Sequence, residues 1–376
     1  MRSKIIAMYL PQFHCIPENN EFWGEGFTDW VAVKKSKPLF SGHQQPRIPL
    51  DEYYYDLSEE RNVRWQCNLA RKHGIYGFGI YHYWFNNEKN LLTKPAEIIR
   101  SNPDIDTHYF FAWDNGNWKR SWSNVEGNDW APLIEGGRNT QVGPKILIPY
   151  ILGDEPDWEN HYNYLKSFFD DPRYVRLNDK PVFVIYNYTP EIGRMANYWN
   201  ELALKDGFSG ICVVYRYKET GRFRMLPIIP SSEYQYNYEP VYNGWQRTTL
   251  VTRIMNKITN IRCNGKRNKL RKLDYDIVWK NILKNAEKEF TRKNFFHGGF
   301  VSYDDTPRRG NKGTIIEGGS PEKFKKYLNE LMLISEKQNK EFIFLTAWNE
   351  WGEGAYLEPD TINKYAYLEV VKELTK

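Results

Sequence analysis

The stretch FIFLTAWNEWGEGAYLEP (residues 342–359) joins an apolar run to a cluster of acidic, aromatic and glycine residues. Its first four residues are hydrophobic, as in a strand that is buried on both faces of a parallel sheet. Glu350 and Glu353 follow, three positions apart, among tryptophans and glycines. Carboxylates beside aromatic walls lose hydration, which raises their pKa and suits them to proton transfer. The alternative is a surface turn with two solvated glutamates, and the rest of the chain decides between the two interpretations.

Short apolar runs recur along the chain, and segments of helical periodicity separate most of them. Eight predicted strands comprise residues 5–10, 77–83, 108–113, 181–186, 211–215, 231–235, 298–303 and 342–347. A ninth run, residues 145–152, is ambiguous and is assigned to a loop. Strands that alternate with helices indicate parallel βαβ units. The predicted fold class is therefore α/β, with residues 1–376 forming a single (β/α)8 (TIM) barrel with long loops.

Polar and aromatic residues follow almost every predicted strand. Catalytic residues of such barrels lie at the C-terminal ends of the strands, so we expect these side chains to line one cleft around Glu350 and Glu353. Candidates for stacking on sugar faces are Trp23, Trp84, Trp113, Trp118 and Trp348, and candidates for bonding hydroxyl groups are His14, His82, Asn117 and Asn349. Further candidates for substrate binding are Tyr9, Gln12, Glu25, Tyr83, Asp114, Tyr186, Glu233, Tyr234, Asp304 and Arg308.

The composition agrees with a carbohydrate ligand but does not require one. The chain has 14 Trp and 27 Tyr, and aromatic residues make up 16% of it. Such rings suit flat, half-apolar ligands rich in hydroxyl groups, although a large aromatic core has the same composition. The four cysteines are widely spaced and form no CxxC or Cys/His cluster. Neither a disulfide framework nor a metal site is expected, and no cofactor is predicted.

Targeting signals are also absent from the sequence. The N-terminal segment MRSKIIAMYLPQFH has too short an apolar run for a signal peptide, and no run is long enough to span a bilayer. Reduced thiols are the simplest state of the cysteines. We therefore expect a soluble, cytoplasmic protein.

Positive charge is concentrated in one segment. Residues 247–293 contain 14 Lys and Arg against 4 Asp and Glu, whereas the whole chain has 52 against 47. The segment predicts a basic helical insertion between the sixth and seventh strands. It is either a solvated helical hairpin or a surface for an anionic membrane face or phosphate-bearing lipid carrier, which would place the protein peripherally at the inner membrane. No nucleic-acid motif accompanies the charge, so no nucleic-acid partner is expected.

Motifs of several other enzyme classes are missing. The chain has no GxGxxG after its first strand, no GxxxxGK[ST], no GxSxG and no HExxH. The turn DDTPRRG has two interpretations. Arg308 and Arg309 either bind a phosphate or a uronate, or pair with Asp304 and Asp305 to hold the loop.

Longer motifs resemble one known family. YLPQFH with PENNEFWGEGFTDW, GIYGFGIYHYWF, DPRYVRLNDKPVFVIY, DDTPRRG and WNEWGEGAYLEPD are similar to the WbsX-like family of bacterial O-antigen, lipopolysaccharide and capsule gene clusters. That family is related to glycoside hydrolase family 99, and the resemblance covers residues 9–360. It implies a (β/α)8 barrel and an oligosaccharide or lipid-linked glycan as the partner. It also implies a catalytic E-x-x-E pair, which Glu350 and Glu353 match.

The resemblance implies a mechanism as well. Family 99 enzymes are retaining endo-acting α-mannosidases, so Glu350 would act as a base on the 2-hydroxyl group and Glu353 as general acid/base at the glycosidic oxygen. Their AWANENW segment reads AWDNGNW here, where Gly116 replaces an acidic residue and Asp114 is the nearest substitute. WbsX-like proteins are called glycosyltransferases although the implied fold is that of a hydrolase. Transfer and cleavage therefore both remain open, and a non-catalytic glycan-binding or assembly factor is the alternative.

Overall fold

Eight parallel strands close into a barrel in the computed structural model, which describes residues 2–119, 146–219, 229–246 and 270–376. In barrel order they are β1 (Lys4–Tyr9), β2 (Gly77–Asn86), β4 (His108–Trp113), β8 (Lys180–Ile185), β9 (Cys212–Arg216), β10 (Tyr234–Tyr236), β12 (Phe295–Phe300) and β15 (Phe342–Thr346). Strand β15 pairs in parallel with β1, which closes the ring. The predicted (β/α)8 barrel is confirmed.

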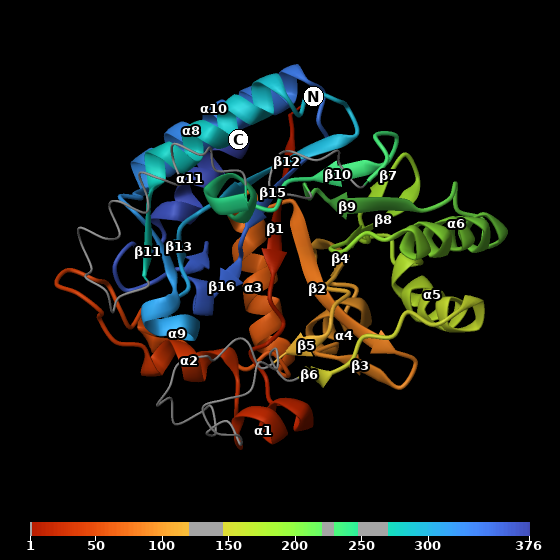
Figure 1. Cartoon of the computed structure of the whole chain (residues 1–376), viewed down its shortest axis with the longest axis horizontal. Coiled ribbons are helices and arrows are strands. Elements are labelled where there is room, and N and C mark those ends of the chain that lie inside the picture. The colour runs from red at the N-terminus through yellow and green to blue at the C-terminus, as the bar shows by residue number, and fades with distance from the viewer. Residues whose placement is uncertain (1, 120–145, 220–228, 247–269) are drawn as a thin grey trace, which may run out of the picture.

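Helices surround the barrel, as Figure 1 shows. They are α3 (Glu60–Lys72), α4 (Lys94–Ser101), α5 (Glu155–Phe169), α6 (Pro190–Lys205), α8 (Tyr275–Lys288), α10 (Pro321–Lys337) and α11 (Ala366–Thr375). Local sequence fixes where they begin: at α10 the Ser320 hydroxyl accepts a hydrogen bond from the Lys323 amide, and a proline occupies the first turn. None of the helices in the described ranges has the length and apolar character that crossing a bilayer requires.

Long loops at the C-terminal ends of the strands carry further elements. These are α1 (Pro17–Trp23), α2 (Asp29–Lys35), η1 (Leu50–Glu52), β3 (Lys89–Leu91), β5 (Trp118–Lys119), β6 (Ile146–Ile148), η3 (Tyr242–Gln246), β11 (Arg271–Asp274), β13 (Tyr303–Asp304), α9 (Thr306–Arg309), η4 (Gly310–Lys312), β14 (Thr314–Glu317), β16 (Asn349–Glu350), η5 (Trp351–Glu353) and β17 (Ala355–Tyr356). Strand β7 (Arg176–Leu177) forms a hairpin with β8. The ambiguous ninth run supplies β6, which pairs with β5 outside the barrel, as expected of a loop element.

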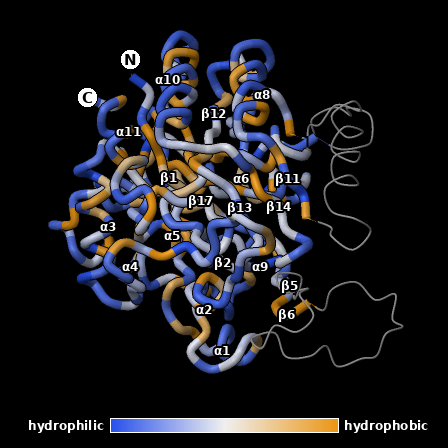
Figure 2. The backbone as a smooth tube through the Cα atoms, turned by 90° about the vertical axis from the view of Figure 1, so that its left-hand side faces the viewer, coloured by the Kyte–Doolittle hydropathy of each residue, from blue (hydrophilic) through white to orange (hydrophobic). Residues whose placement is uncertain are grey.

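Aromatic side chains fill much of the core. Apolar residues concentrate on the barrel strands and on the inner faces of the helices, as the hydropathy colouring in Figure 2 shows. The largest fully buried side chains include Trp113, Trp199, Trp279, Trp348 and Trp351. Much of the aromatic content therefore stabilises the fold by burial, and only part of it is available to a ligand.

Two strand predictions are displaced. Strand β10 begins at Tyr234 rather than at residue 231, because the Asn294 side-chain amide binds the carbonyl oxygens of Ser231 to Glu233 and holds them in a loop. Strand β12 begins at Phe295 rather than at residue 298. Glycines 298 and 299 lie inside it, since a side chain at Gly298 would overlap the carbonyl oxygen of Asn237.

The structure describes only part of the predicted basic insertion. Residues 247–269 lie outside the described residues, so this part of the prediction stays untested. The rest of the segment forms β11 and α8, and α8 is a helix of the barrel that buries Val278, Trp279 and Ile282. The boundaries 247–293 stay a prediction. Within them, the lysines of α8 lie on the exposed face of a helix of the barrel, which gives this helix its basic composition.

Candidate active site

A cavity of about 410 Å³ opens at the C-terminal ends of the barrel strands. Every barrel strand contributes to its lining, directly or through the loop that follows it. Leu10 follows β1, Tyr81 and Tyr83 belong to β2, and Asp114 follows β4. The loops after β12 and β15 supply most of the charged residues. The cavity therefore occupies the place where active sites of (β/α)8 barrels lie.

Glu350 and Glu353 both line this cavity. Strand β15 leads into β16, which ends at Glu350, and the single turn η5 carries Glu353. Gly354 then reverses the chain in a left-handed conformation (φ 56°), so that β17 pairs back onto β16. Glu350 is 4% exposed, whereas the side chain of Glu353 is 23% exposed and faces the cavity more openly.

Of the two residues between the glutamates, Trp351 and Gly352, the second has to be a glycine. The Gly352 amide donates a hydrogen bond to Asp29 Oδ2 (3.1 Å). A Cβ at this position would lie 2.5 Å from Arg308 Nε and 2.7 Å from Asp29 Oδ2. The glycine thus allows the backbone to approach a buried ion pair, which a larger residue would displace.

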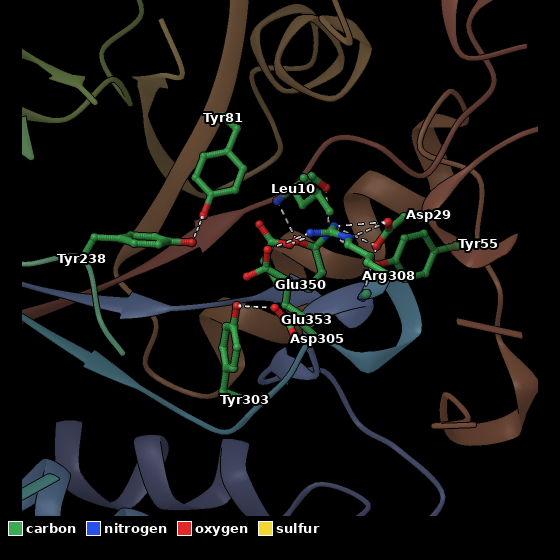
Figure 3. Close-up of polar contacts among 12 residues, drawn as sticks. Leu10, Asp29, Tyr55, Tyr81, Tyr238, Tyr303, Asp305, Arg308, Glu350 and Glu353 are labelled. Carbon is green, nitrogen blue, oxygen red and sulfur yellow. Dashed lines mark hydrogen bonds and ion pairs between the residues drawn. The ribbon is translucent and has the colours of Figure 1, made fainter. Parts of the chain in front are cut away.

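That ion pair centres on Arg308, which contacts three carboxylates (Figure 3). Its Nη2 donates to Asp29 Oδ1 (3.1 Å) and to Glu350 Oε2 (3.2 Å), and its Nη1 donates to Glu353 Oε1 (2.8 Å). Nε also binds Asp29 (3.2 Å). One planar guanidinium group therefore fixes both glutamates relative to each other, with Asp29 of α2 as its anchor.

The cluster contains more carboxyl groups than cations. Burial and the negative charge of Glu353 raise the pKa of Glu350 to about 8, against the opposing effect of Arg308. A buried carboxyl group next to another carboxylate holds its proton because the two charges repel each other. Burial and the neighbouring carboxylate thus favour the protonated form of Glu350, and the surroundings of the two glutamates differ, as in acid–base pairs.

Tyrosines form the opposite wall. The hydroxyl groups of Tyr81 and Tyr238 lie 3.3 Å apart, and the Arg216 guanidinium lies 4.5 Å from the Tyr238 ring centroid and 5.3 Å from that of Tyr186. Burial raises the pKa of all three tyrosines well above its ordinary value. They stay neutral, so their hydroxyl groups can donate to and accept from a sugar hydroxyl.

Some of the predicted site residues line the cavity together. Besides Glu350 and Glu353 they are Tyr83, Asp114, Tyr186 and Arg308. Burial raises the pKa of Asp114, while Arg216 and Lys218 oppose the shift. Arg309 pairs with Asp305 (3.2 Å), which is the structural interpretation of the DDTPRRG turn, whereas Arg308 binds the glutamates.

Alternation along β2 explains two predicted residues that lie elsewhere, His82 and Trp84. Side chains of a strand point to opposite faces in turn, so Tyr81 and Tyr83 face the cavity while His82 and Trp84 face the helices. His82 Nε2 lies 2.8 Å from Nε2 of His161 on α5, and Trp84 stacks on the same imidazole at 4.3 Å. Trp113 also packs there and donates its indole N–H to the Trp84 carbonyl.

Other predicted residues stabilise the loops around the site rather than line it. Asn349 binds the backbone of Leu10 at both N–H and C=O, and Trp348 packs on Phe78. The remaining positions are as follows: Tyr9 bonds Gln66, Asp304 accepts from His43 and Gln45, Asn117 accepts from the Tyr150 amide, Trp118 packs on Tyr83 and Phe85, Trp23 packs on Phe27, and Glu25 accepts from Asn20. Gln12 and His14 are buried in the loop after β1, and burial lowers the pKa of His14.

Glu233 and Tyr234 lie outside the candidate site altogether. They stand at the amino end of β10 and line a separate cavity of about 470 Å³ beside α6. The displaced strand prediction is the cause, because it began β10 three residues too early and so placed Glu233 and Tyr234 further along the strand. The loop that follows β10 does bring residues to the site, among them Tyr238.

Sequence reasoning missed Arg216 and Trp245, which line the cavity, and Asp29, which binds Arg308 beside it. Arg216 is the last residue of β9. The expectation that site residues lie at the C-terminal ends of the barrel strands would therefore have included it. Asp29 opens α2, far from any predicted strand, and nothing in the sequence links it to Arg308 across 279 positions.

The fold and the cavity define the class: a (β/α)8-barrel protein with a candidate acid–base site at the C-terminal ends of its strands. The chain belongs to the glycosyltransferase WbsX family, whose model matches residues 5–371. It is therefore grouped with carbohydrate-active proteins. The WxcX proteins of two strains of Xanthomonas campestris pv. campestris are each 29% identical over 99% of this chain. The chain spans about half the length of these relatives, since the match covers 49% of each.

Solved structures share the fold at low sequence identity. The family 99 endo-α-mannosidase of Bacteroides thetaiotaomicron is 13% identical, with a TM-score of 0.53 over 98% of this chain and 95% of that one. A glycoside hydrolase-like protein is also 13% identical, with a TM-score of 0.57 over 100% and 94% of the two chains. These similarities support the barrel architecture of the chain.

Proposed function

We propose that the chain is an enzyme that transfers or cleaves glycosyl units with retention of configuration, with Glu350 and Glu353 as its catalytic pair. One observation carries the proposal: both carboxylates line one cavity and bind the two terminal nitrogens of one guanidinium group. Retaining enzymes hold their carboxyl groups roughly 5 Å apart, and bonding to neighbouring nitrogens favours such a short separation. The family and the fold support bacterial surface polysaccharide synthesis, of O-antigen or capsule, as the setting.

The two glutamates have different surroundings, which supports different roles. Glu353 is the more exposed and is the general acid/base at the glycosidic oxygen. Glu350 is buried and accepts the proton of the 2-hydroxyl group. Tyr81, Tyr186 and Tyr238 would orient the sugar through hydroxyl contacts and ring faces. The substrate is an oligosaccharide or a lipid-linked glycan, and residues 1–376 act as one domain.

The raised pKa of Glu350 makes the role of this residue testable by pH. A base has to be ionised, and burial together with Glu353 raises the pKa of Glu350 to about 8. We therefore expect kcat/KM to rise with pH toward about 8 as Glu350 ionises, since kcat/KM reports ionisations of the free enzyme. A rate that falls with pH through the same range would instead make Glu350 the proton donor.

Product analysis tests the function itself. The protein is incubated with free and with lipid-linked oligosaccharides of one surface polysaccharide, and the products are identified by mass spectrometry. Water addition would identify a hydrolase and a lengthened acceptor a transferase, and both support the proposal. Bound but unchanged glycan with every acceptor would favour the alternative, a non-catalytic glycan-binding or assembly factor.

The basic segment suggests a membrane partner. We propose that residues 247–269, with 7 Lys and Arg and no acidic residue, contact anionic lipid at the cytoplasmic face of the membrane. Co-sedimentation with anionic vesicles should then fall steeply as salt is added, because salt screens exposed charges. Equal binding to neutral and anionic vesicles would contradict this proposal.

A further inference from the structure

Three cationic side chains stand at the mouth of the candidate active site. Arg271 opens β11, Arg309 ends α9, and Lys312 ends η4, and all three are exposed residues that line the cavity. The small sheet of β11, β14 and β13 brings them together, beside α9 and on one side of the barrel (Figure 1). We call Arg271, Arg309 and Lys312 the cationic rim.

Backbone contacts fix the position of the rim. Arg271 pairs with Thr314 in the parallel register of β11 and β14, and its amide donates to the Gly313 carbonyl (2.9 Å). The Gly313 amide in turn donates to Gly310, which closes the turn that carries Lys312. Arg271 is far from the other two rim residues in the sequence, and a turn separates Arg309 from Lys312. The small sheet nevertheless holds all three around one opening.

Alternation along β11 selects Arg271 for the cavity. Its neighbour Lys272 points away and meets Glu317 (2.8 Å) and the Phe40 ring (3.4 Å), so that its charge is neutralised elsewhere. Arg271 faces the same opening as Glu350 and Glu353, whose charges Arg308 already opposes at the cavity floor. Arg309 forms an ion pair with Asp305 (3.2 Å). The cations therefore gather at the mouth and the acids lie below them.

We propose that the cationic rim is a subsite for an anionic group of the glycan substrate, either a phosphate or a carboxylate. Guanidinium groups bind both with paired hydrogen bonds, and the ammonium group of Lys312 adds a point charge. Across the cavity, Arg216 lies over the rings of Tyr186 and Tyr238, where a neighbouring sugar ring can stack. The position of the subsite next to the catalytic pair rests on the proposed function, whereas anion binding itself requires no turnover.

Calorimetry on the whole chain tests the subsite with defined probes. Inorganic diphosphate represents a phosphate-bearing substrate, glucuronate a carboxylate-bearing one, and methyl α-mannoside a neutral sugar. We expect one or both anions to bind, and the double substitution Arg271→Gln with Lys312→Gln to weaken that binding about tenfold or more, the scale of lost hydrogen bonds to a charged group. The affinity for the anion should also fall with added salt.

Two controls separate the rim from general effects of charge and folding. Lys284→Gln removes one positive charge from the exposed face of α8 and should leave anion binding unchanged. Arg271→Lys with Lys312→Arg keeps both charges and should retain most of the affinity. Unchanged circular dichroism would show that the neutral variant is folded, since its two sites are exposed.

The binding results distinguish the two kinds of anionic group and can also contradict the subsite. Binding of diphosphate alone points to a phosphate group on the substrate, and binding of glucuronate alone to an acidic sugar. If neither anion binds, or if the neutral double variant binds as tightly as the unmodified protein, the subsite is wrong. If instead the anion binds at the rim while Glu350→Gln and Glu353→Gln keep full turnover, the proposed catalytic pair fails and the subsite stands.

Discussion

Glu350→Gln and Glu353→Gln are each expected to slow turnover by on the order of a hundredfold or more, the usual scale of general acid–base catalysis. Glutamine keeps the shape of the side chain but can neither give nor take the proton. Because both glutamates act on the same transition state, the double variant should be little slower than the slower single variant. Steady-state rates on the glycan that product analysis identifies provide the measurement.

A matched control is available elsewhere in the barrel. Glu239 is also a buried glutamate whose pKa burial raises to about 8, but it binds Asn243 and does not line the cavity. Glu239→Gln should therefore leave turnover nearly unchanged while testing the general effect of neutralising a buried carboxyl group. Full activity of both Glu350→Gln and Glu353→Gln would show that these carboxylates only stabilise the loop.

Removing Arg308 is expected to produce the largest loss of stability. Arg308→Met leaves Asp29, Glu350 and Glu353 close together without their shared cation. Breaking a buried ion pair at one partner lowers the free energy of unfolding by about 3–5 kcal/mol, because the remaining charges stay desolvated. Urea unfolding at pH 8 measures this loss. Arg309→Met, one residue further along, removes a guanidinium group that is 57% exposed and pairs with a single carboxylate, and should cost less than Arg308→Met.

The loss should depend on pH in a defined direction. Arg308 lowers the pKa of Glu350, so its removal raises the pKa of this buried carboxyl group further above its unfolded value. A group with a raised folded pKa favours the folded state at low pH and opposes it as pH rises through that pKa. The difference between Arg308→Met and the unmodified protein should therefore shrink from pH 8 to pH 5. A difference that is the same at both values would assign the effect of Arg308 to packing.

The sequence predicts the barrel well, for a physical reason. Parallel strands covered on both faces need continuous apolar runs, and seven of the eight runs consist largely of such residues. The exception is residues 231–235, where β10 has only Tyr234–Tyr236 and takes its position from Asn294. A short strand has too few residues for its hydrophobic pattern to show where it begins and ends.

The candidate site is less predictable because it depends on side-chain direction. The glutamate pair, Tyr83, Asp114, Tyr186 and Arg308 were found because they follow strands or lie near their ends. His82 and Trp84 share that position but point outward, and a strand covered on both faces gives no polarity signal to distinguish its sides. Asp29 could not be found at all, because its partner is fixed only by the closed barrel.

The cluster around Arg308 joins the two ends of the barrel sequence. Asp29 comes from the loop after the first strand, Arg308 from the loop after the seventh, and the glutamates from the loop after the eighth. A chain that has formed only some of its βα units therefore contains both glutamates without the arrangement that holds them. The proposed catalytic arrangement therefore requires the first, seventh and eighth strands to be in place together. Under the proposed function, a copy whose ring is not closed would lack the arrangement needed to act on glycans.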